Sequence, residues 1–182
     1  MLILTEENDA ATLSGILPHR NEVSRFVRLP VPRETKAEVE MVSRFTALPA
    51  EGLFLTDVRS MADIEKASSL LRVAAAKSNR PQRTPQIIAN IDTPEAALGI
   101  SGFNRAVAGL CALVLDEPAL ADTLGMDPKD LPLQALRPQF ILAAKVCGAV
   151  PLLRMEEHRA ADADNAPLRG QGFAGLVLAS RS

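Results

Sequence analysis

Residues 86–125 decide the fold, and they read QIIANIDTPEAALGISGFNRAVAGLCALVLDEPALADTLG. The stretch opens with Gln86–Ile91, a short apolar run that stops at Asp92. Thr93 can accept a backbone N–H as the N-cap of a helix, and Pro94 suits the first helical position because proline has no N–H to satisfy there. This order predicts a strand, then an acidic residue, then a helix that continues to about Ile100.

The second half of the stretch repeats the same order. Residues 108–115 are continuously apolar, end at the acidic pair Asp116 and Glu117, and are followed by Pro118, which can open another helix. Continuous apolar runs of this length are typical of strands buried on both faces, as in a parallel sheet covered by helices. Two neighbouring strands therefore end in carboxylates, at the edge where α/β barrels and open α/β sheets hold their functional sites.

The same alternation extends along the chain and predicts one α/β domain with a parallel sheet over residues 1–182. Helical spacing predicts a helix over Thr35–Ala47, and a capping box at residues 60–63 predicts another. We also expect a short helix over residues 10–16, and a helix over residues 134–147 with Pro138 in its first turn. The seven predicted strands are residues 2–4, 23–29, Gly52–Thr56, Gln86–Ile91, 108–115, 149–153 and 173–179.

Composition argues against several classes of function. The net charge of −2 gives no basis for binding nucleic acid or an anionic membrane, and 3% aromatic residues are too few for stacking platforms. We find no run of signal-peptide or transmembrane length. Cys111 and Cys147 fall on apolar faces of predicted elements, so we expect buried, reduced thiols and a cytoplasmic protein.

Two further charged residues lie near predicted strand ends. Glu7 belongs to an acidic cluster after residues 2–4 and is either a strand-end carboxylate or part of a solvated turn. Arg28, near the end of residues 23–29, could hold an anionic group of a substrate or form a surface salt bridge. His19 and His158 are expected to be exposed, because no second histidine or cysteine lies at metal-ligand spacing.

Six segments together resemble motifs of the citrate lyase beta-subunit family, within the HpcH/HpaI aldolase superfamily of phosphoenolpyruvate-binding-type barrels. They follow the family's order and spacing over most of the chain, which is more persuasive than any one match. The segments are LILTEEN (2–8), GLFLTDV with SMADI (52–58 and 60–64), IANIDTP (88–94), VAGL with LADTLG (107–110 and 120–125), Arg137 with AAKVCG (143–148), and GFAG (172–175).

The resemblance implies a (β/α) TIM-type barrel that is incomplete, with about seven parallel strands and no counterpart of the family's first strand. It also implies a lyase that cleaves or forms carbon–carbon bonds in an oxo acid or acyl-CoA through an enolate. Arg28 matches the family arginine that binds the substrate carboxylate, and Glu7 matches the glutamate of another family motif, so both are candidate catalytic residues.

Mg²⁺ is the cofactor that the resemblance implies, since hard oxygen ligands hold it and it stabilises enolate charge. Asp92 replaces a metal-binding glutamate of the family. The family's metal-binding aspartate falls on Ala119, so Asp116 or Glu117 is expected to serve in its place if the turn is rebuilt. Asp92, Asp116 and Glu117 are therefore the predicted metal ligands.

A barrel of seven strands leaves two strand edges unpaired. We expect a loop, a bulged closure or a partner subunit to cover them, and we expect a homo-oligomer. Two functions stay open: a divergent Mg²⁺-dependent lyase, or a non-catalytic relative that acts as a binding or scaffold protein. In the second, the strand-end carboxylates only favour the helix N-termini that follow them.

Overall fold

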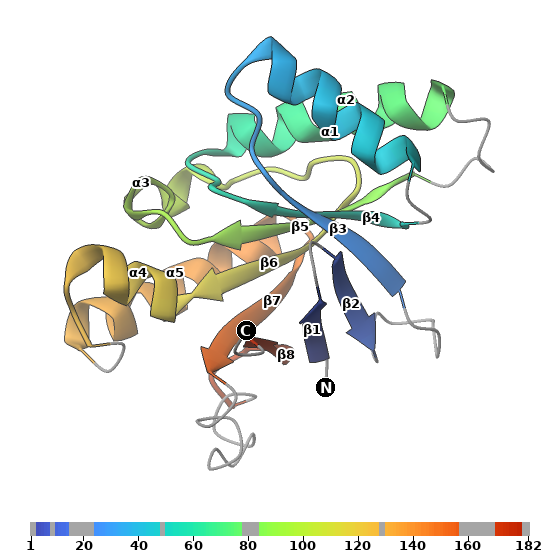
Figure 1. Cartoon of the computed structure of the whole chain (residues 1–182). Coiled ribbons are helices and arrows are strands. Elements are labelled where there is room, and N and C mark those ends of the chain that lie inside the picture. The colour runs from blue at the N-terminus through green and yellow to red at the C-terminus, as the bar shows by residue number, and fades with distance from the viewer. Residues whose placement is uncertain are drawn as a thin grey trace.

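The computed structural model describes residues 3–7, 10–14, 24–47, 50–77, 84–127, 130–156 and 170–179. These parts form one eight-stranded sheet with helices on its outer face (Figure 1). The strands are β1 (Ile3–Glu7), β2 (Ala10–Ser14), β3 (Ser24–Pro30), β4 (Gly52–Thr56), β5 (Gln86–Ile91), β6 (Leu110–Asp116), β7 (Val150–Glu156) and β8 (Gly175–Ala179). The helices are α1 (Thr35–Ala47), α2 (Met61–Lys77), α3 (Pro94–Leu98), the 3₁₀ turn η1 (Ile100–Gly102), α4 (Glu117–Leu124) and α5 (Leu131–Val146).

The sheet combines six parallel strands with one reversed strand. Strands β3 to β8 pair in parallel in chain order, whereas β2 pairs antiparallel with both β1 and β3. Because β1 and β3 both run opposite to β2, β1 points in the same direction as the six parallel strands. β1 also lies beside β8, so the sheet curls round on itself (Figure 1). The predicted α/β barrel is confirmed, and all seven predicted strands exist and share one direction.

The helix expected over residues 10–16 is wrong, because residues 10–14 form strand β2. Ala10 lies opposite Glu7 of β1 and Val27 of β3, so the backbone of this segment is paired on both sides. Pairing on both sides outweighs the weak helical preference of a five-residue segment, which is too short to be a stable helix alone. β2 is thus an eighth strand between β1 and β3, and the two edges of the sheet are β1 and β8, which lie side by side. Cover of these edges by a loop, a bulged closure or a partner subunit stays a prediction.

A second correction concerns the start of α5. The helix begins at Leu131, with Pro132 at its second position, so Pro138 lies inside the helix and not in its first turn. A proline there removes one backbone hydrogen bond. Burial of Leu133 and Phe140 against the sheet accompanies this loss, and the helix continues to Val146.

The other helix starts agree with the sequence. The Thr93 hydroxyl accepts the N–H of Ala96 at 3.2 Å, as expected of the N-cap of α3. At the start of α2, the Asp63 carboxylate accepts the N–H of Ser60 at 3.0 Å, which is one of the two bonds of the predicted capping box. These local bonds fix where each helix begins after its strand.

Two hydrophobic cores lie on the two faces of the sheet. The larger one packs the helices against the sheet, and the smaller one fills the interior of the barrel. Strands buried on both faces explain the continuous apolar runs of the sequence. The interior core consists of Phe26, Phe54, Ile88, Ala112, Val114, Leu152 and Val177.

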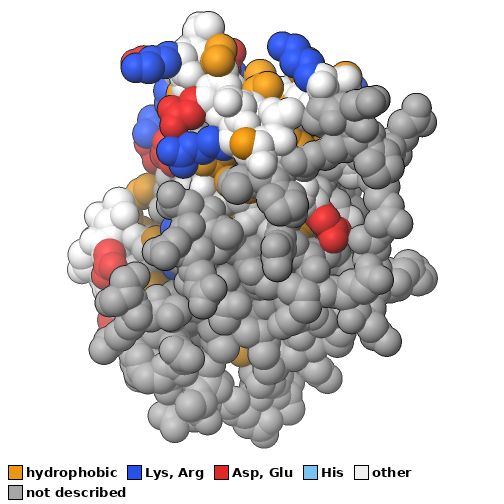
Figure 2. Space-filling model, turned by 45° about the vertical axis from the view of Figure 1, so that its right-hand side comes forward, with side chains coloured by type: hydrophobic (Ala, Val, Ile, Leu, Met, Phe, Trp, Pro, Cys, Tyr) orange, Lys and Arg blue, Asp and Glu red, His pale blue; other side chains and the backbone are white. Residues whose placement is uncertain are grey.

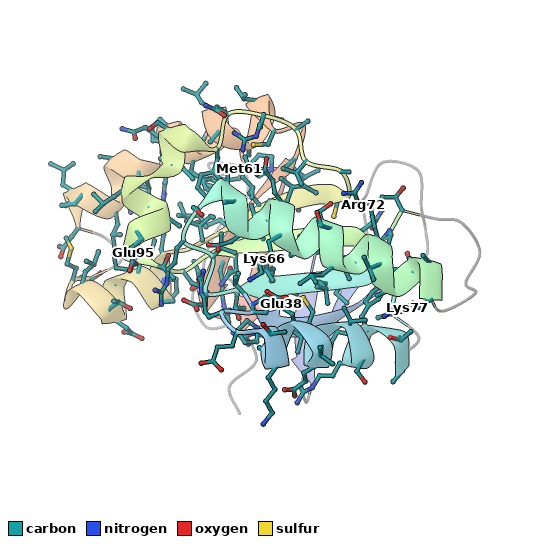
Figure 3. All side chains as sticks on the ribbon, turned by 90° about the horizontal axis from the view of Figure 1, so that it is seen from above. Glu38, Met61, Lys66, Arg72, Lys77 and Glu95 are labelled. Atoms are coloured by element: carbon teal, nitrogen blue, oxygen red, sulfur yellow. The ribbon has the colours of Figure 1, made fainter. Side chains whose placement is uncertain are left out.

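The described outer surface carries charged side chains of both signs (Figure 2). Lys66 of α2 joins α1, because its ammonium lies 2.6 Å from the Glu38 carboxylate and donates to the carbonyl of Pro32 (Figure 3). Basic and acidic side chains are interspersed over the described part of the face in Figure 2.

Among the described helices, none has the length and hydrophobicity that a bilayer span requires. Cys147 is buried as predicted and Cys111 is half-buried, and both are free thiols.

Candidate active site at the carboxyl ends of the strands

Polar side chains occupy inward-facing positions near the carboxyl ends of five neighbouring strands. Alternate residues of a strand face the same side, so an inward apolar residue is followed two positions later by another inward residue. On β3 to β7 this second residue is polar. The pairs are Phe26 and Arg28, Phe54 and Thr56, Ile88 and Asn90, Val114 and Asp116, and Leu152 and Arg154. The carboxyl end of the barrel is therefore lined with groups that can hydrogen bond.

Three of these side chains and Asp92 form one buried network. The amide nitrogen of Asn90 donates to Oδ2 of Asp92 at 3.0 Å and to Oδ2 of Asp116 at 2.9 Å. Arg154 donates from Nη1 to the same Asp116 oxygen at 3.0 Å. Asn90 is fully buried, and the side chains of Asp116 and Arg154 are 4% and 12% exposed. The network thus joins the ends of β5, β6 and β7.

The carboxyl group of Asp92 has a raised pKa. Burial raises the pKa of its carboxyl above the ordinary 3.8, and the charge of Asp116 adds to this rise. Hydrogen bonds from the Asn90 amide and from the backbone N–H of Asp57 act in the opposite direction. A carboxyl with a raised pKa at the end of a barrel strand is a candidate for proton transfer.

Asp92 also holds the turn after β4. Its two carboxylate oxygens lie 3.1 and 3.3 Å from the backbone N of Asp57, which has a φ of +55°. Non-glycine residues rarely adopt this left-handed conformation, and it costs free energy unless neighbours fix it. Arg33 fixes the other side of the turn by donating to the Asp57 carbonyl at 2.6 Å. Asp92 therefore has a structural role whatever its chemical role.

The two predicted catalytic residues are Arg28 on β3 and Glu7 on β1, and both strands pair with β2. The guanidinium of Arg28 lies 5.9 Å from the centre of the Phe54 ring, a residue of the interior core. Glu7 is the last residue of β1, opposite Ala10. Its backbone thus lies at a strand end as predicted, while its side chain falls outside the described residues.

The carboxylate of Glu117 pairs with Arg137 and lies apart from the Asn90 network. Its two oxygens accept from Nε and Nη2 of Arg137 on α5, at 2.6 and 2.7 Å. The Glu117 side chain is 6% exposed and that of Arg137 is 17% exposed. This buried bidentate ion pair joins the first turn of α4 to α5, so the carboxylate is directed to a helix and not to the Asn90 network.

The predicted Mg²⁺ ligands are surrounded by hydrogen-bond donors. Besides Asn90 and Arg154 on Oδ2, Asp116 accepts the N–H of Ala119 on Oδ1 at 3.1 Å, as the N-cap of α4. Two like unit charges 4 Å apart repel by about 4 kcal/mol at an effective dielectric constant of 20, and a divalent ion beside a guanidinium doubles the charge product. Among the described residues, no three acidic, histidine or cysteine side chains come together to hold a metal. The donor set around Asp116 does not fit Mg²⁺.

The orientation of Asn90 agrees with that conclusion. Its Nδ2 faces the two carboxylates, whereas its Oδ1 is buried without a hydrogen-bond partner among the described residues. The reverse orientation would place Oδ1 against two carboxylate oxygens, which a bound cation or a protonated carboxyl would have to stabilise. The amide thus acts as a donor that links two acids.

Asn90 and Arg154 are the site residues that the sequence analysis missed. Asn90 lies within the predicted strand Gln86–Ile91, and Arg154 lies one residue beyond the predicted strand 149–153. Extending the alternation from Ile88 to Asn90, and from Leu152 to Arg154, would have placed both on the inner face.

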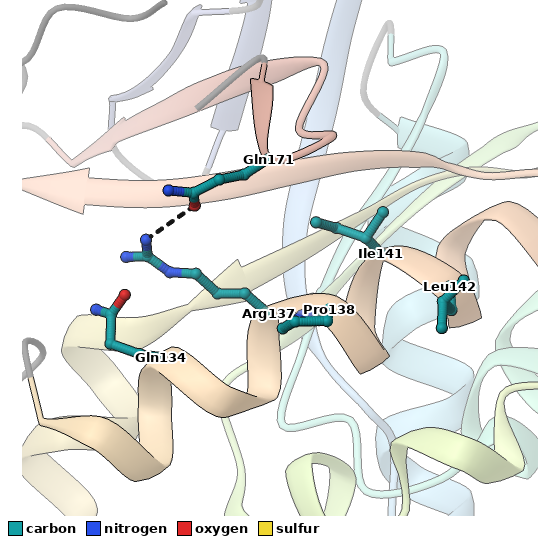
Figure 4. Close-up of a pocket in the computed structure, with 6 residues that line it drawn as sticks. All are labelled: Gln134, Arg137, Pro138, Ile141, Leu142 and Gln171. Carbon is teal, nitrogen blue, oxygen red and sulfur yellow. Dashed lines mark hydrogen bonds between the residues drawn. The ribbon is translucent and has the colours of Figure 1, made fainter. Parts of the chain in front are cut away.

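A pocket of about 540 Å³ lies against α5, apart from the inward-facing side chains (Figure 4). Arg137 crosses it and donates to the side-chain oxygen of Gln171 at 3.1 Å. Since the guanidinium already binds Glu117, its charge is balanced inside the protein. The pocket is lined by Gln134, Arg137, Pro138, Ile141, Leu142 and Gln171.

Neither a scan against protein-family models nor a search of curated proteins returns a match. Solved structures do resemble the chain. An HpcH/HpaI aldolase from Desulfitobacterium hafniense is 18% identical, with a TM-score of 0.61 over 86% of this chain and 66% of that one. A citrate lyase from Burkholderia xenovorans is 13% identical, with a TM-score of 0.69 over 85% and 53%. A malate synthase of Haloferax volcanii, in complex with magnesium and glyoxylate, is 13% identical, with a TM-score of 0.68 over 84% and 51%.

The chain thus spans between about half and two thirds of the length of these structures. At such low identity the likeness concerns architecture, and it agrees with the family that the sequence motifs resemble. The chain has the α/β barrel fold of these HpcH/HpaI aldolase, citrate lyase and malate synthase structures.

Proposed function

We propose that the chain binds a small oxo acid or acyl-CoA at the carboxyl end of its barrel and cleaves or forms a carbon–carbon bond through an enolate. The observation that carries the proposal is the buried Asn90 network, which places an acid of raised pKa, Asp92, at the end of the barrel where this fold holds its sites. The shared architecture with aldolase, citrate lyase and malate synthase structures supports it.

The residues have distinct roles in this proposal. In retro-aldol cleavage, the substrate hydroxyl loses a proton, the carbon–carbon bond breaks, and its electron pair forms an enolate that later takes up a proton. Asp92 is the group that accepts and returns the proton. Arg28, beside Phe54, binds the carboxylate of the substrate and offsets the developing charge. No step depends on Mg²⁺.

One observation favours the second candidate, a non-catalytic binding or scaffold protein. Three carboxylates at strand ends already have a structural partner: Asp116 binds Arg154, Glu117 binds Arg137, and Asp92 holds the turn at Asp57. These contacts account for the three acids without any chemistry.

Enolate formation separates the two candidates directly. Exchange of the methyl protons of pyruvate and of acetyl-CoA for deuterium can be followed by ¹H NMR in D₂O with purified protein. We expect the wild type to accelerate the exchange of at least one of them, and Asp92→Asn to slow it by about 10²-fold or more, the usual contribution of a positioned proton-transfer group.

Asp122→Asn is the matched control, because Asp122 is an exposed aspartate on α4 outside the network. It should exchange both compounds at the wild-type rate. If the wild type exchanges neither compound above the buffer rate, the lyase proposal fails and the non-catalytic candidate takes its place. If Asp92→Asn is as active as the control, Asp92 is not the proton-transfer group.

A further inference from the structure

The geometry points to a barrel in which the guanidinium of Arg154 takes the place of a divalent cation at the strand-end carboxylates. Because the inference concerns only the charge balance at Asp116, it holds whether or not the chain is a lyase. It assigns to Arg154 a positioning role, as the built-in counter-ion of the Asn90 network.

The position of Arg154 is fixed by the sheet. Arg154 of β7 is the register partner of Asp116 on β6, and both follow inward apolar residues of the barrel core. The 3.0 Å bond between them is buried, since neither side chain is more than 12% exposed. Strand register and burial therefore both hold the guanidinium beside Asp116.

Three of the roughly four lone-pair sites of the Asp116 carboxylate accept a hydrogen bond. Oδ2 receives the Asn90 amide as well as Arg154, and Oδ1 receives the N–H of Ala119. A metal ligand directs an oxygen lone pair at the ion, and a guanidinium bound to the same oxygen repels that ion. Without the guanidinium, the nearly buried Asp116 would lack a counter-ion, and Asp92 lies on the other side of the same amide. Removing Arg154 should therefore make Asp116 require a bound cation, which it does not require in the wild type.

Magnesium itself is the probe. Thermal unfolding and isothermal titration calorimetry are run on the wild type, on Asp116→Asn, on Arg154→Met, and on Arg154→Met combined with Asp116→Asn. Each protein is measured in millimolar MgCl₂ and in KCl of the same ionic strength. Arg105→Met is the matched control, since Arg105 pairs with Glu65 on the surface and its side chain is 56% exposed.

We expect no Mg²⁺ binding and no change in the melting temperature for the wild type and for Arg105→Met. Arg154→Met should melt at a lower temperature, and MgCl₂ but not KCl should raise it. The combined variant should lose this response, because the uncompensated carboxylate is gone. Arg154→Gln, which keeps an amide donor without the charge, gives a second test if Arg154→Met does not fold.

Two results would overturn the inference. One is millimolar or tighter Mg²⁺ binding by the wild type that disappears in Asp116→Asn. The other is a folded Arg154→Met or Arg154→Gln protein whose melting temperature does not respond to Mg²⁺. Neither measurement uses a substrate, so both are independent of the enolate test of the proposed function.

Discussion

Replacing Arg137 by methionine should destabilise the fold by about 3–5 kcal/mol, the usual cost of leaving a buried charge without its partner. The charge left behind is that of Glu117, whose side chain is 6% exposed and receives both of its short hydrogen bonds from Arg137. Methionine keeps much of the volume of arginine but donates nothing. For a chain of this length the loss corresponds to a fall of roughly 6–20 °C in melting temperature.

Urea unfolding followed by circular dichroism measures the change in the free energy of unfolding. The double variant Arg137→Met with Glu117→Leu should recover most of the stability, because a hydrophobic pair of similar size can replace a buried ion pair at little cost. Arg105→Met removes an exposed ion pair instead and should cost about 1 kcal/mol or less. A cost for Arg137→Met no larger than that of Arg105→Met would refute the argument, since it would mean that Glu117 is solvated.

Three further predictions follow from single residues. Gly52→Ala should destabilise by about 1–3 kcal/mol or more, because a methyl group there would collide with a backbone oxygen of β5, whereas Gly102→Ala, with open space around it, should leave the urea midpoint nearly unchanged. The pKa of Asp92 in the folded state lies above 3.8, so ionisation of Asp92 opposes folding. The stability of the wild type relative to Asp92→Asn should therefore fall as pH rises from 3.8 through the raised pKa, and then stay constant. A stability difference that does not change with pH in urea unfolding would contradict this. Burial raises the pKa of Cys111 to about 12 and also raises the pKa of Cys147. A disulfide reagent at mildly alkaline pH should therefore label neither thiol until denaturant is added. Rapid labelling of the native protein would show that one of the thiols is accessible.

The parts of the fold that the sequence predicted well are those with local causes. Gly52–Thr56 and Gln86–Ile91 are strands with the predicted bounds, because their continuous apolar runs need burial on both faces. The helix after Asp92 begins where Thr93 can cap it, since capping involves residues three apart in the chain. These signals lie within a few residues of the element that they define.

The two errors have non-local causes. Residues 10–14 are a strand because β1 and β3 supply hydrogen-bond partners, and nothing within the segment specifies those partners. Pro138 lies inside α5 because packing of the helix against the sheet outweighs the loss of one hydrogen bond. In both cases tertiary contacts override a local preference.

The candidate site divides in the same way. By itself the sequence determined that Asp92 and Asp116 would end two neighbouring strands, because strand order and direction follow from the repeated alternation of strands and helices. Only the tertiary structure decided that Asn90 would join these two acids, that Arg154 would neutralise one of them, and that Arg137 would turn Glu117 towards α5. The physical reason is that charges interact through space, so the partner of a carboxylate is set by the register of the sheet and the packing of the helices and not by its neighbours in the chain.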